Sequence, residues 1–310
     1  MNPNPFVSSL QGVATLNHLG VIRISGEDAA KFIHGQLTQD FSLLGQDAAR
    51  LSAFCSAKGR MQASFIGFKR PNGDILLVGS ADLVPASAKR LSMFVMRAKA
   101  KVTDATAEFA VWGLAGCATK IIAGAAYSAW AKADFDDATV VNLYPALGVN
   151  RQLWVAPMGS PAPAGDTLEQ ALWAWGEVRS GVATLSAPLV EAFVPQMLNY
   201  ESIGGVNFKK GCYPGQEVVA RSQFRGTLKR RAYLVHATSA MEPGHSLFVP
   251  DDAEQPVATV VQAAPAPGGG FDAIISGQTS AIDAGVLHLG DSNGPQLAVL
   301  PLPYALLDDI

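Results

Sequence analysis

Charged residues and cysteines are both scarce in this sequence. Lys, Arg, Asp and Glu make up 16% of the 310 residues, and the net charge is -3. Such a chain has no overall positive field that would attract nucleic acid. Its three cysteines, Cys55, Cys117 and Cys212, are odd in number and far apart. They form neither a disulfide framework nor a paired metal site, which favours a reducing, cytoplasmic location.

Long apolar runs and targeting signals are missing too. No charge-free apolar run is long enough to span a bilayer as a helix. The first basic residue is Arg23, so the chain lacks the cationic start of a signal peptide. The five histidines show no metal-ligand spacing. We therefore expect no metal and no membrane partner, and the 49% of hydrophobic residues suffices for two or three globular units.

The two parts of the chain differ in their periodicity. Residues 1–226 mix strand patterns with helical ones, the latter at 87–99, 119–132 and 168–179. Beyond residue 228, short strand patterns are separated by turn residues and no helix is indicated. The sequence thus predicts an α+β region over 1–226 and a small antiparallel β-barrel over 227–310. The boundary is expected near Gly226-Thr227.

One stretch carries distinctive chemistry, Lys209–Glu217. Gly211 and Gly215 interrupt regular structure and place Cys212 on a loop. A thiol that lies just before a helix N-terminus and beside Lys210 meets the conditions that favour the thiolate. Most single cysteines are small buried residues. The flanking charges and glycines argue against burial here, so we expect an exposed, reactive thiol.

A helix is predicted to follow this loop from Gln216 onward. Glu217 falls in its first turn, where a carboxylate suits the helix dipole. Arg221 lies four residues later, at the spacing of a stabilising pair with Glu217.

The loop and helix together resemble a known family signature. The string K-G-C-Y-x-G-Q-E-x-x-x-R consists of Lys210, Gly211, Cys212, Tyr213, Gly215, Gln216, Glu217 and Arg221. It is similar to the signature of the YgfZ-type folate-binding proteins, which are relatives of the aminomethyltransferase (T-protein) of the glycine cleavage system. Further similar elements occur at residues 32–38, 57–61, 193–212 and 301–304. The resemblance therefore extends over nearly the whole chain.

This resemblance implies a fold and a set of ligand-binding positions. The family has two intertwined α+β domains around a central folate channel, followed by a C-terminal barrel. The first domain would comprise residues 1–48 and 150–226, and the second residues 49–149. A tetrahydrofolate would be the cofactor. Trp173 matches an aromatic position linked to folate, where it could stack on the ligand or simply pack the core, as we expect for Trp175.

Two departures from the family pattern affect the expected ligand site. Leu19 stands at a second folate-linked position that is Trp in relatives, so only an apolar wall is expected there. Arg179 stands where aminomethyltransferases have a Glu that binds the pterin. A guanidinium cannot accept hydrogen bonds. Arg179 would instead pair with Glu177 or hold a carboxylate of the ligand.

A third departure argues against aminomethyl transfer. The aminomethyltransferases place two Asp after a double-glycine turn, and Gln62 and Ala63 stand there in this chain. Gln62 cannot act as a general base. A nucleophilic pair of Cys212 with His34 is conceivable, although a non-catalytic His34 is favoured.

A basic cluster surrounds the signature and leaves the kind of partner open. It comprises Lys209, Lys210, Arg221, Arg225, Lys229, Arg230 and Arg231. Such a cluster can be a solvated face, or it can attract an anion such as a folate polyglutamate tail or RNA phosphate. No aromatic RNA-reading motif lies nearby, which favours the small molecule.

The resemblance implies an accessory factor that binds tetrahydrofolate and supports the assembly or repair of iron–sulfur clusters. Iron–sulfur enzymes that modify tRNA would depend on it, and client or assembly proteins would bind transiently. Two alternatives remain, a folate-dependent one-carbon transferase and an RNA-binding module.

Overall fold

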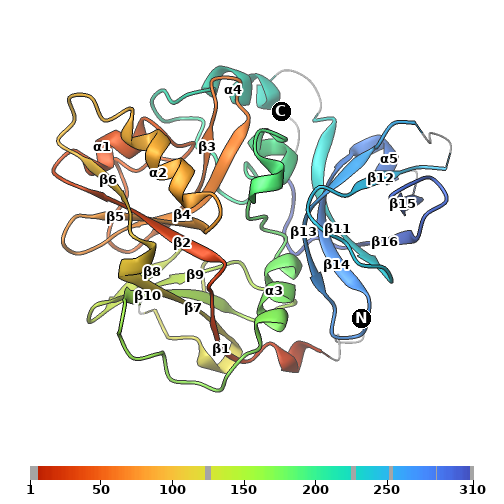
Figure 1. Cartoon of the computed structure of the whole chain (residues 1–310), viewed down its shortest axis with the longest axis horizontal. Coiled ribbons are helices and arrows are strands. Elements are labelled where there is room, and N and C mark those ends of the chain that lie inside the picture. Colours follow the sequence, from red (N-terminus) through yellow and green to blue (C-terminus); the bar gives the residue numbers. More distant parts are fainter. Residues whose placement is uncertain (1–5, 123–126, 225–227, 251–253, 284, 308–310) are drawn as a thin grey trace.

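Two five-stranded sheets and a closed barrel form the protein (Figure 1). The computed structural model describes residues 6–122, 127–224, 228–250, 254–283 and 285–307. Among these residues, no helix combines the length and the apolar character that crossing a membrane would require.

The first sheet has the strand order β1-β7-β10-β9-β8, with antiparallel neighbours. Its strands are β1 (Gly12–Thr15), β7 (Phe109–Ala115), β8 (Lys132–Phe135), β9 (Ala138–Asn142) and β10 (Arg151–Pro157). Strand β1 is thus paired with a strand about a hundred residues later in the chain, Val13 lying opposite Leu114. This sheet contributes Leu153 and Val155 to a core that also contains Trp173.

The second sheet has the order β3-β4-β5-β2-β6 and is antiparallel as well. Its strands are β2 (Leu19–Ser25), β3 (Ala49–Cys55), β4 (Met61–Lys69), β5 (Ile75–Ser80) and β6 (Lys101–Asp104). The helices α1 (Ala29–His34) and α2 (Val84–Ser92) accompany it. Its middle strands β4 and β5 are buried at most positions on both faces, as expected for a sheet that is covered on both sides.

The barrel follows the order β11-β14-β13-β12-β15-β16 and lies apart from the two sheets in Figure 1. Its strands are β11 (Arg230–Ala237), β12 (Ser246–Phe248), β13 (Ala258–Pro265), β14 (Phe271–Gln278), β15 (Leu287–Leu289) and β16 (Gln296–Leu300), and α5 (Thr279–Asp283) follows β14. Buried Val235, Val260 and Ile275 belong to its own core. Helix α3 (Gln170–Arg179) packs against β13 and β14 on the side that faces the sheets.

The predicted α+β region followed by an antiparallel barrel is confirmed. The predicted domain limits within residues 1–226 stay a prediction. Strand pairing crosses those limits, because β2 pairs with β5 and β1 pairs with β7. The boundary at Gly226-Thr227 lies outside the described residues.

The helix predicted over residues 119–132 is wrong for the described part of that range. A short 3-10 turn (Gly116–Ala118) precedes it and β8 begins at Lys132. The backbone carbonyl of Trp130 accepts a hydrogen bond from the amide of Ala49, and its indole Nε1 donates to the carbonyl of Ile203 at 3.0 Å. These tertiary bonds outweigh the modest helix propensity of the Ala-rich sequence.

Candidate functional site: the Cys212 loop and the cavity beside Trp173

The thiol of Cys212 lies on an exposed loop just before α4 (Gln216–Phe224), as predicted. Within α4, Arg221 Nη2 donates to Glu217 Oε1 at 2.9 Å, which confirms the predicted pair. Both side chains are exposed, so the pair contributes little to stability. Cys55, by contrast, is buried, and burial raises the pKa of its thiol to about 12.

The side chain of Lys210 is buried against the protein and does not face solvent. Its Nζ donates to the carbonyl oxygens of His34 and of Leu37, the latter at 2.8 Å. It also lies over the ring of Tyr213, 4.7 Å from the centroid. Burial lowers the pKa of Lys210 to about 8, although the charges of Asp40 and Cys212 oppose this shift. Lys210 therefore fixes the backbone on either side of Gly211.

Two glycines allow the loop to contact the turn at residues 57–61. Gly215 has φ +79°, and a Cβ there would lie 2.4 Å from the carbonyl oxygen of Ser56. Gly59 has φ +70°, and a Cβ there would lie 2.9 Å from that of Val218. Both positions combine a left-handed backbone with close approach, so only glycine fits without strain. The turn at residues 57–61 and the Cys212 loop, about 150 residues apart in the sequence, thus pack directly against each other.

His34 lies beside the loop but bonds elsewhere. Its Nδ1 is 3.0 Å from Asp40 Oδ1. Burial would raise the pKa of Asp40, but the Leu43 amide and His34 together lower it. A Cβ on Gly211 would lie 3.3 Å from His34 Nε2, so the imidazole packs against the loop backbone. The described hydrogen bonds of His34 do not include Cys212.

A small cavity lies between the two sheets and α3. Its free volume is about 50 Å³, and its lining is mostly apolar. The walls include Leu16, Leu19, Phe65, Trp173, Glu177 and Tyr200. Trp173 is almost fully buried, so it packs the core and lines the cavity at once. Leu19 supplies apolar wall, as expected.

Glu177 is the carboxylate of this cavity and was not predicted to face it. Its Oε1 accepts a hydrogen bond from Trp173 Nε1 at 3.0 Å and lies 3.2 Å from His18 Nε2. Burial would raise the pKa of Glu177, but His18, Arg151 and the indole lower it overall. A fixed anion therefore stands at the wall of an otherwise apolar cavity. The spacing of four residues from Trp173 was the sequence signal for this contact.

Arg151 covers one face of Trp173. Its guanidinium lies 4.2 Å from the centre of the indole, a cation–π contact inside the protein. Burial lowers the pKa of Arg151 to about 10, partly offset by the charge of Glu177. Gly113 abuts the same ring, because a Cβ there would lie 2.5 Å from it. The indole is thus held rigidly at the cavity wall.

Arg179 turns away from this cavity toward the barrel. Its Nη1 lies 3.2 Å from Asp272 Oδ2, so the alternative pairing with Glu177 is wrong. Trp175 Nε1 donates to the same carboxylate oxygen at 2.7 Å. Asp272 therefore ties α3 to the barrel, and Arg179 does not line the described cavity.

The basic cluster is not one continuous exposed patch. Lys210 and Arg231 are buried, and Arg230 is half-buried. Lys209, Arg221 and Lys229 are exposed, and Arg225 lies outside the described residues. Elsewhere, within the described parts of the chain, no three His, Cys, Asp or Glu side chains gather as metal ligands would.

Gln62 and Ala63 stand at the two positions where aminomethyltransferases have Asp. Gln62 Nε2 donates to Glu191 Oε1 at 2.9 Å, and Ala63 is buried in the core. Neither residue offers a base.

Comparison with known proteins places these features in a family. The chain is 29% identical over 306 residues to "tRNA-modifying protein YgfZ" of Edwardsiella ictaluri, covering 92% of this chain and 89% of that protein. It is 30% identical over 238 residues to the protein of the same name from Vibrio vulnificus (strain YJ016), covering 74% and 71%.

The fold has a solved counterpart. The glycine cleavage system aminomethyltransferase T from Bartonella henselae aligns with a TM-score of 0.65 at 15% identity, over 97% of this chain and 90% of that one. This likeness concerns the fold alone. A scan of family models gave no match.

Proposed function

The chain belongs to the YgfZ family of tRNA-modifying proteins, and on this premise we propose that it is a cytoplasmic, folate-binding accessory protein. It supports the assembly or repair of iron–sulfur clusters through the thiol of Cys212. The iron–sulfur enzymes that depend on it include those that modify tRNA.

One observation carries this proposal: an exposed thiol on a loop whose surroundings are rigid. Lys210 holds the backbone before Cys212, and the contact of Gly215 with Gly59 holds the backbone after it. A thiol held in this way is presented to partners without the entropy cost of ordering a mobile loop. The described residues offer no set of further metal ligands around it. A cluster or thiol exchanged at Cys212 would therefore take its other ligands from a transient partner protein.

The tetrahydrofolate is proposed to bind at the cavity beside Trp173. Apolar walls suit a flat ring, and the anionic Glu177 can accept hydrogen bonds from the amino and ring N–H groups of a pterin. Aminomethyltransferases have a pterin-binding Glu at the position of Arg179, and Glu177 takes over the role of that Glu in this proposal. The free volume of about 50 Å³ is below the 300 Å³ or so typical of ligand pockets, so the walls must separate on binding.

The role of the thiol is tested in cells that lack the native protein. We expect Cys212→Ala to lose its support of iron–sulfur enzyme activity. Cys117→Ala is the matched control, because Cys117 is also exposed. Full rescue by Cys212→Ala would refute the proposed role of the thiol.

Folate binding is tested separately by calorimetry with a tetrahydrofolate. We expect Glu177→Gln to weaken binding about tenfold or more, because hydrogen bonds to a charged acceptor are strong. Glu169→Gln is the control, since Glu169 is exposed at the start of the same helix. Absence of binding to the wild-type protein would contradict the proposed cofactor.

The two alternatives have less structural support. An aminomethyl transfer would need a base near the folate nitrogen, and Gln62 and Ala63 supply none. RNA binding remains a prediction, but burial of Lys210 and Arg231 reduces the charge that phosphates would meet.

A further inference from the structure

A second and larger hollow lies where the barrel meets the α+β region. It is bordered by the 3-10 helix η5 (Pro195–Leu198), by α4, by the start of β11 and by the β14–α5 junction. Its volume is about 780 Å³, within the range of small-molecule sites. Its lining includes Gln196, Ser222, Lys229, Arg230 and Ser280. We call this hollow the barrel groove; it shares no described lining residue with the cavity beside Trp173.

The lining of the barrel groove combines cationic and apolar side chains. Lys229 and Arg230 are its charged members, and no carboxylate occurs among its described lining residues. Lys229 is exposed, and the guanidinium of Arg230 makes a long hydrogen bond within the described residues, from Nη1 to the carbonyl oxygen of Ser276 at 3.3 Å. Two cations without a counter-charge in the lining attract an anion. The lining also includes the apolar side chains of Val194 and Met197, which suit an apolar body.

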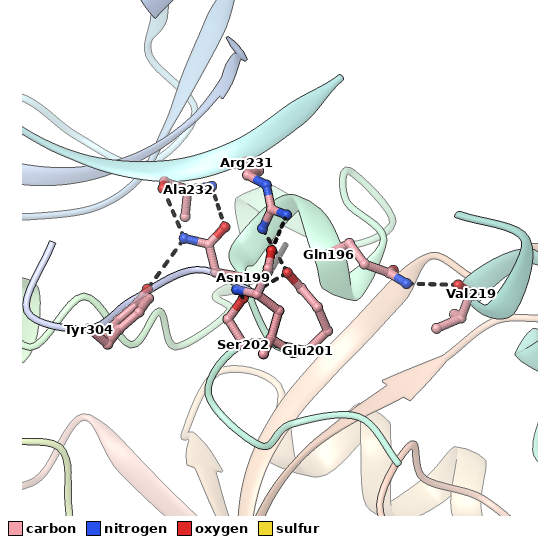
Figure 2. Close-up of polar contacts among 9 residues, drawn as sticks. Gln196, Asn199, Glu201, Ser202, Val219, Arg231, Ala232 and Tyr304 are labelled. Atoms are coloured by element: carbon pink, nitrogen blue, oxygen red, sulfur yellow. Dashed lines mark hydrogen bonds and ion pairs between the residues drawn. The ribbon is translucent and has the colours of Figure 1, made fainter. Parts of the chain in front are cut away.

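Gln196 adds a buried acceptor that lacks a partner. The side chain is fully buried and lines the barrel groove. Its Nε2 donates to the carbonyl oxygen of Val219 at 2.7 Å, as Figure 2 shows. This bond fixes the amide orientation, and Oε1 has no hydrogen-bond partner among the residues that the structure describes. Buried acceptors are rarely left unpaired. An N–H or O–H group, from a ligand or from an ordered water, would satisfy this acceptor.

The walls of the barrel groove are fixed before any ligand arrives. Asn199, which follows η5, accepts a hydrogen bond from the amide of Ala232 at 3.0 Å and donates to its carbonyl at 2.9 Å (Figure 2). Arg231 pairs with Glu201 at 2.8 Å. These bonds join the segment around η5 to β11, so they hold Gln196 and Arg230 on segments that are bonded to each other. Fixed walls lower the ordering cost of binding.

We propose that the barrel groove binds a small organic anion of about nucleotide size. Its phosphate or carboxylate group contacts Lys229 and Arg230, and its N–H or O–H donor contacts Gln196 Oε1. The hydroxyl groups of Ser222 and Ser280 complete the polar wall. The ligand would bridge α4, which follows the Cys212 loop, and the barrel.

Calorimetry on the full chain tests this proposal with two probes. Adenosine 5′-monophosphate offers a phosphate, and a γ-linked triglutamate offers carboxylates. We expect one of them to bind and Lys229→Ala to weaken that binding about tenfold or more, because a charge-assisted contact is lost. The preferred probe identifies the anionic group. Lys209→Ala, which removes an exposed cation outside the barrel groove, should bind as the wild type does.

Further variants separate this site from the cavity beside Trp173. Binding should survive Glu177→Gln, and Gln196→Leu should weaken it in a protein whose thermal melting shows that it is folded. Lys229→Ala is at an exposed position and is expected to fold normally. Millimolar probes that fail to bind, equal binding by Lys229→Ala and wild type, or binding by long RNA alone would each overturn the proposal.

Discussion

Replacement of Arg231 by Ala should destabilise the protein more than any other removal of a cation from the basic cluster. Arg231 Nη1 lies 2.8 Å from Glu201 Oε1, and the two side chains are 8% and 0% exposed. Its Nη2 also donates to the carbonyl of Leu307 at 3.0 Å. Figure 2 shows this pair between η5 and β11. The variant would leave the carboxylate of Glu201 buried without its cation.

The expected loss is about 3–5 kcal/mol, the range for breaking a buried ion pair by removing one partner. Arg230→Ala serves as the control. Arg230 is half-buried and makes one contact of 3.3 Å, so its loss should cost about 1 kcal/mol or less. The assay is urea unfolding followed by far-UV circular dichroism, with equal treatment of both variants.

The stability that Arg231→Ala loses should depend on pH. Burial raises the pKa of Glu201, and the Ser202 hydroxyl and the charge of Arg231 oppose that rise. When folding raises the pKa of a carboxyl, the protein loses stability as the pH increases from the ordinary pKa of that group through its pKa in the folded state. Without Arg231 the pKa of Glu201 rises further. The penalty of Arg231→Ala should therefore be larger at pH 8 than at pH 5.

A second substitution tests the cause directly. Glu201→Gln in the Arg231→Ala background removes the buried charge and should recover part of the lost stability. The reasoning is refuted if Arg231→Ala costs no more than Arg230→Ala, if its cost is the same at both pH values, or if Glu201→Gln recovers nothing.

Three other predictions concern the loop and the cavity. Gly215→Ala should lower unfolding free energy by more than Gly73→Ala, because both have positive φ but a Cβ meets backbone only at Gly215; equal losses in urea unfolding would contradict this. Cys55 should resist alkylation at pH 8 until the protein unfolds; mass spectrometry of the labelled native protein checks it. Burial would lower the pKa of His18, but the hydrogen bond and charge of Glu177 outweigh burial and raise this pKa. Proton NMR should therefore find a His18 pKa above 6.5 in the wild type and a lower one in Glu177→Gln. The same pKa in both proteins would argue against the His18–Glu177 pair.

Much of the fold was predictable because it depends on local patterns. Short alternating strands with turn residues between them indicated the barrel, and the mixed patterns before residue 226 indicated the α+β part. The exceptions are segments whose tertiary bonds compete with local propensity. The range 119–132 was predicted as a helix, yet the backbone and indole of Trp130 within it bond to residues of distant segments.

The candidate site divides in the same way. Local spacing predicted the exposed Cys212 and the pair of Glu217 with Arg221. It also placed Lys210 beside the thiol, with which the side chain does interact, but it did not indicate that this side chain is buried and bonded to the carbonyl oxygens of His34 and Leu37. The carboxylate of Glu177 was assigned to another face of its helix, but packing of α3 between the sheets and the barrel turns it into the cavity.

The sequence by itself determined the order of the α+β region and the barrel, the position of the Cys212 loop and the family to which its motif is similar. These depend on backbone preference and on residues within a few positions of each other. Only the tertiary structure decided which charges lose their water and which partners they gain. Lys210, Glu177, Gln196 and Arg231 all owe their roles to contacts with distant segments, because desolvation is set by the packing of the whole chain.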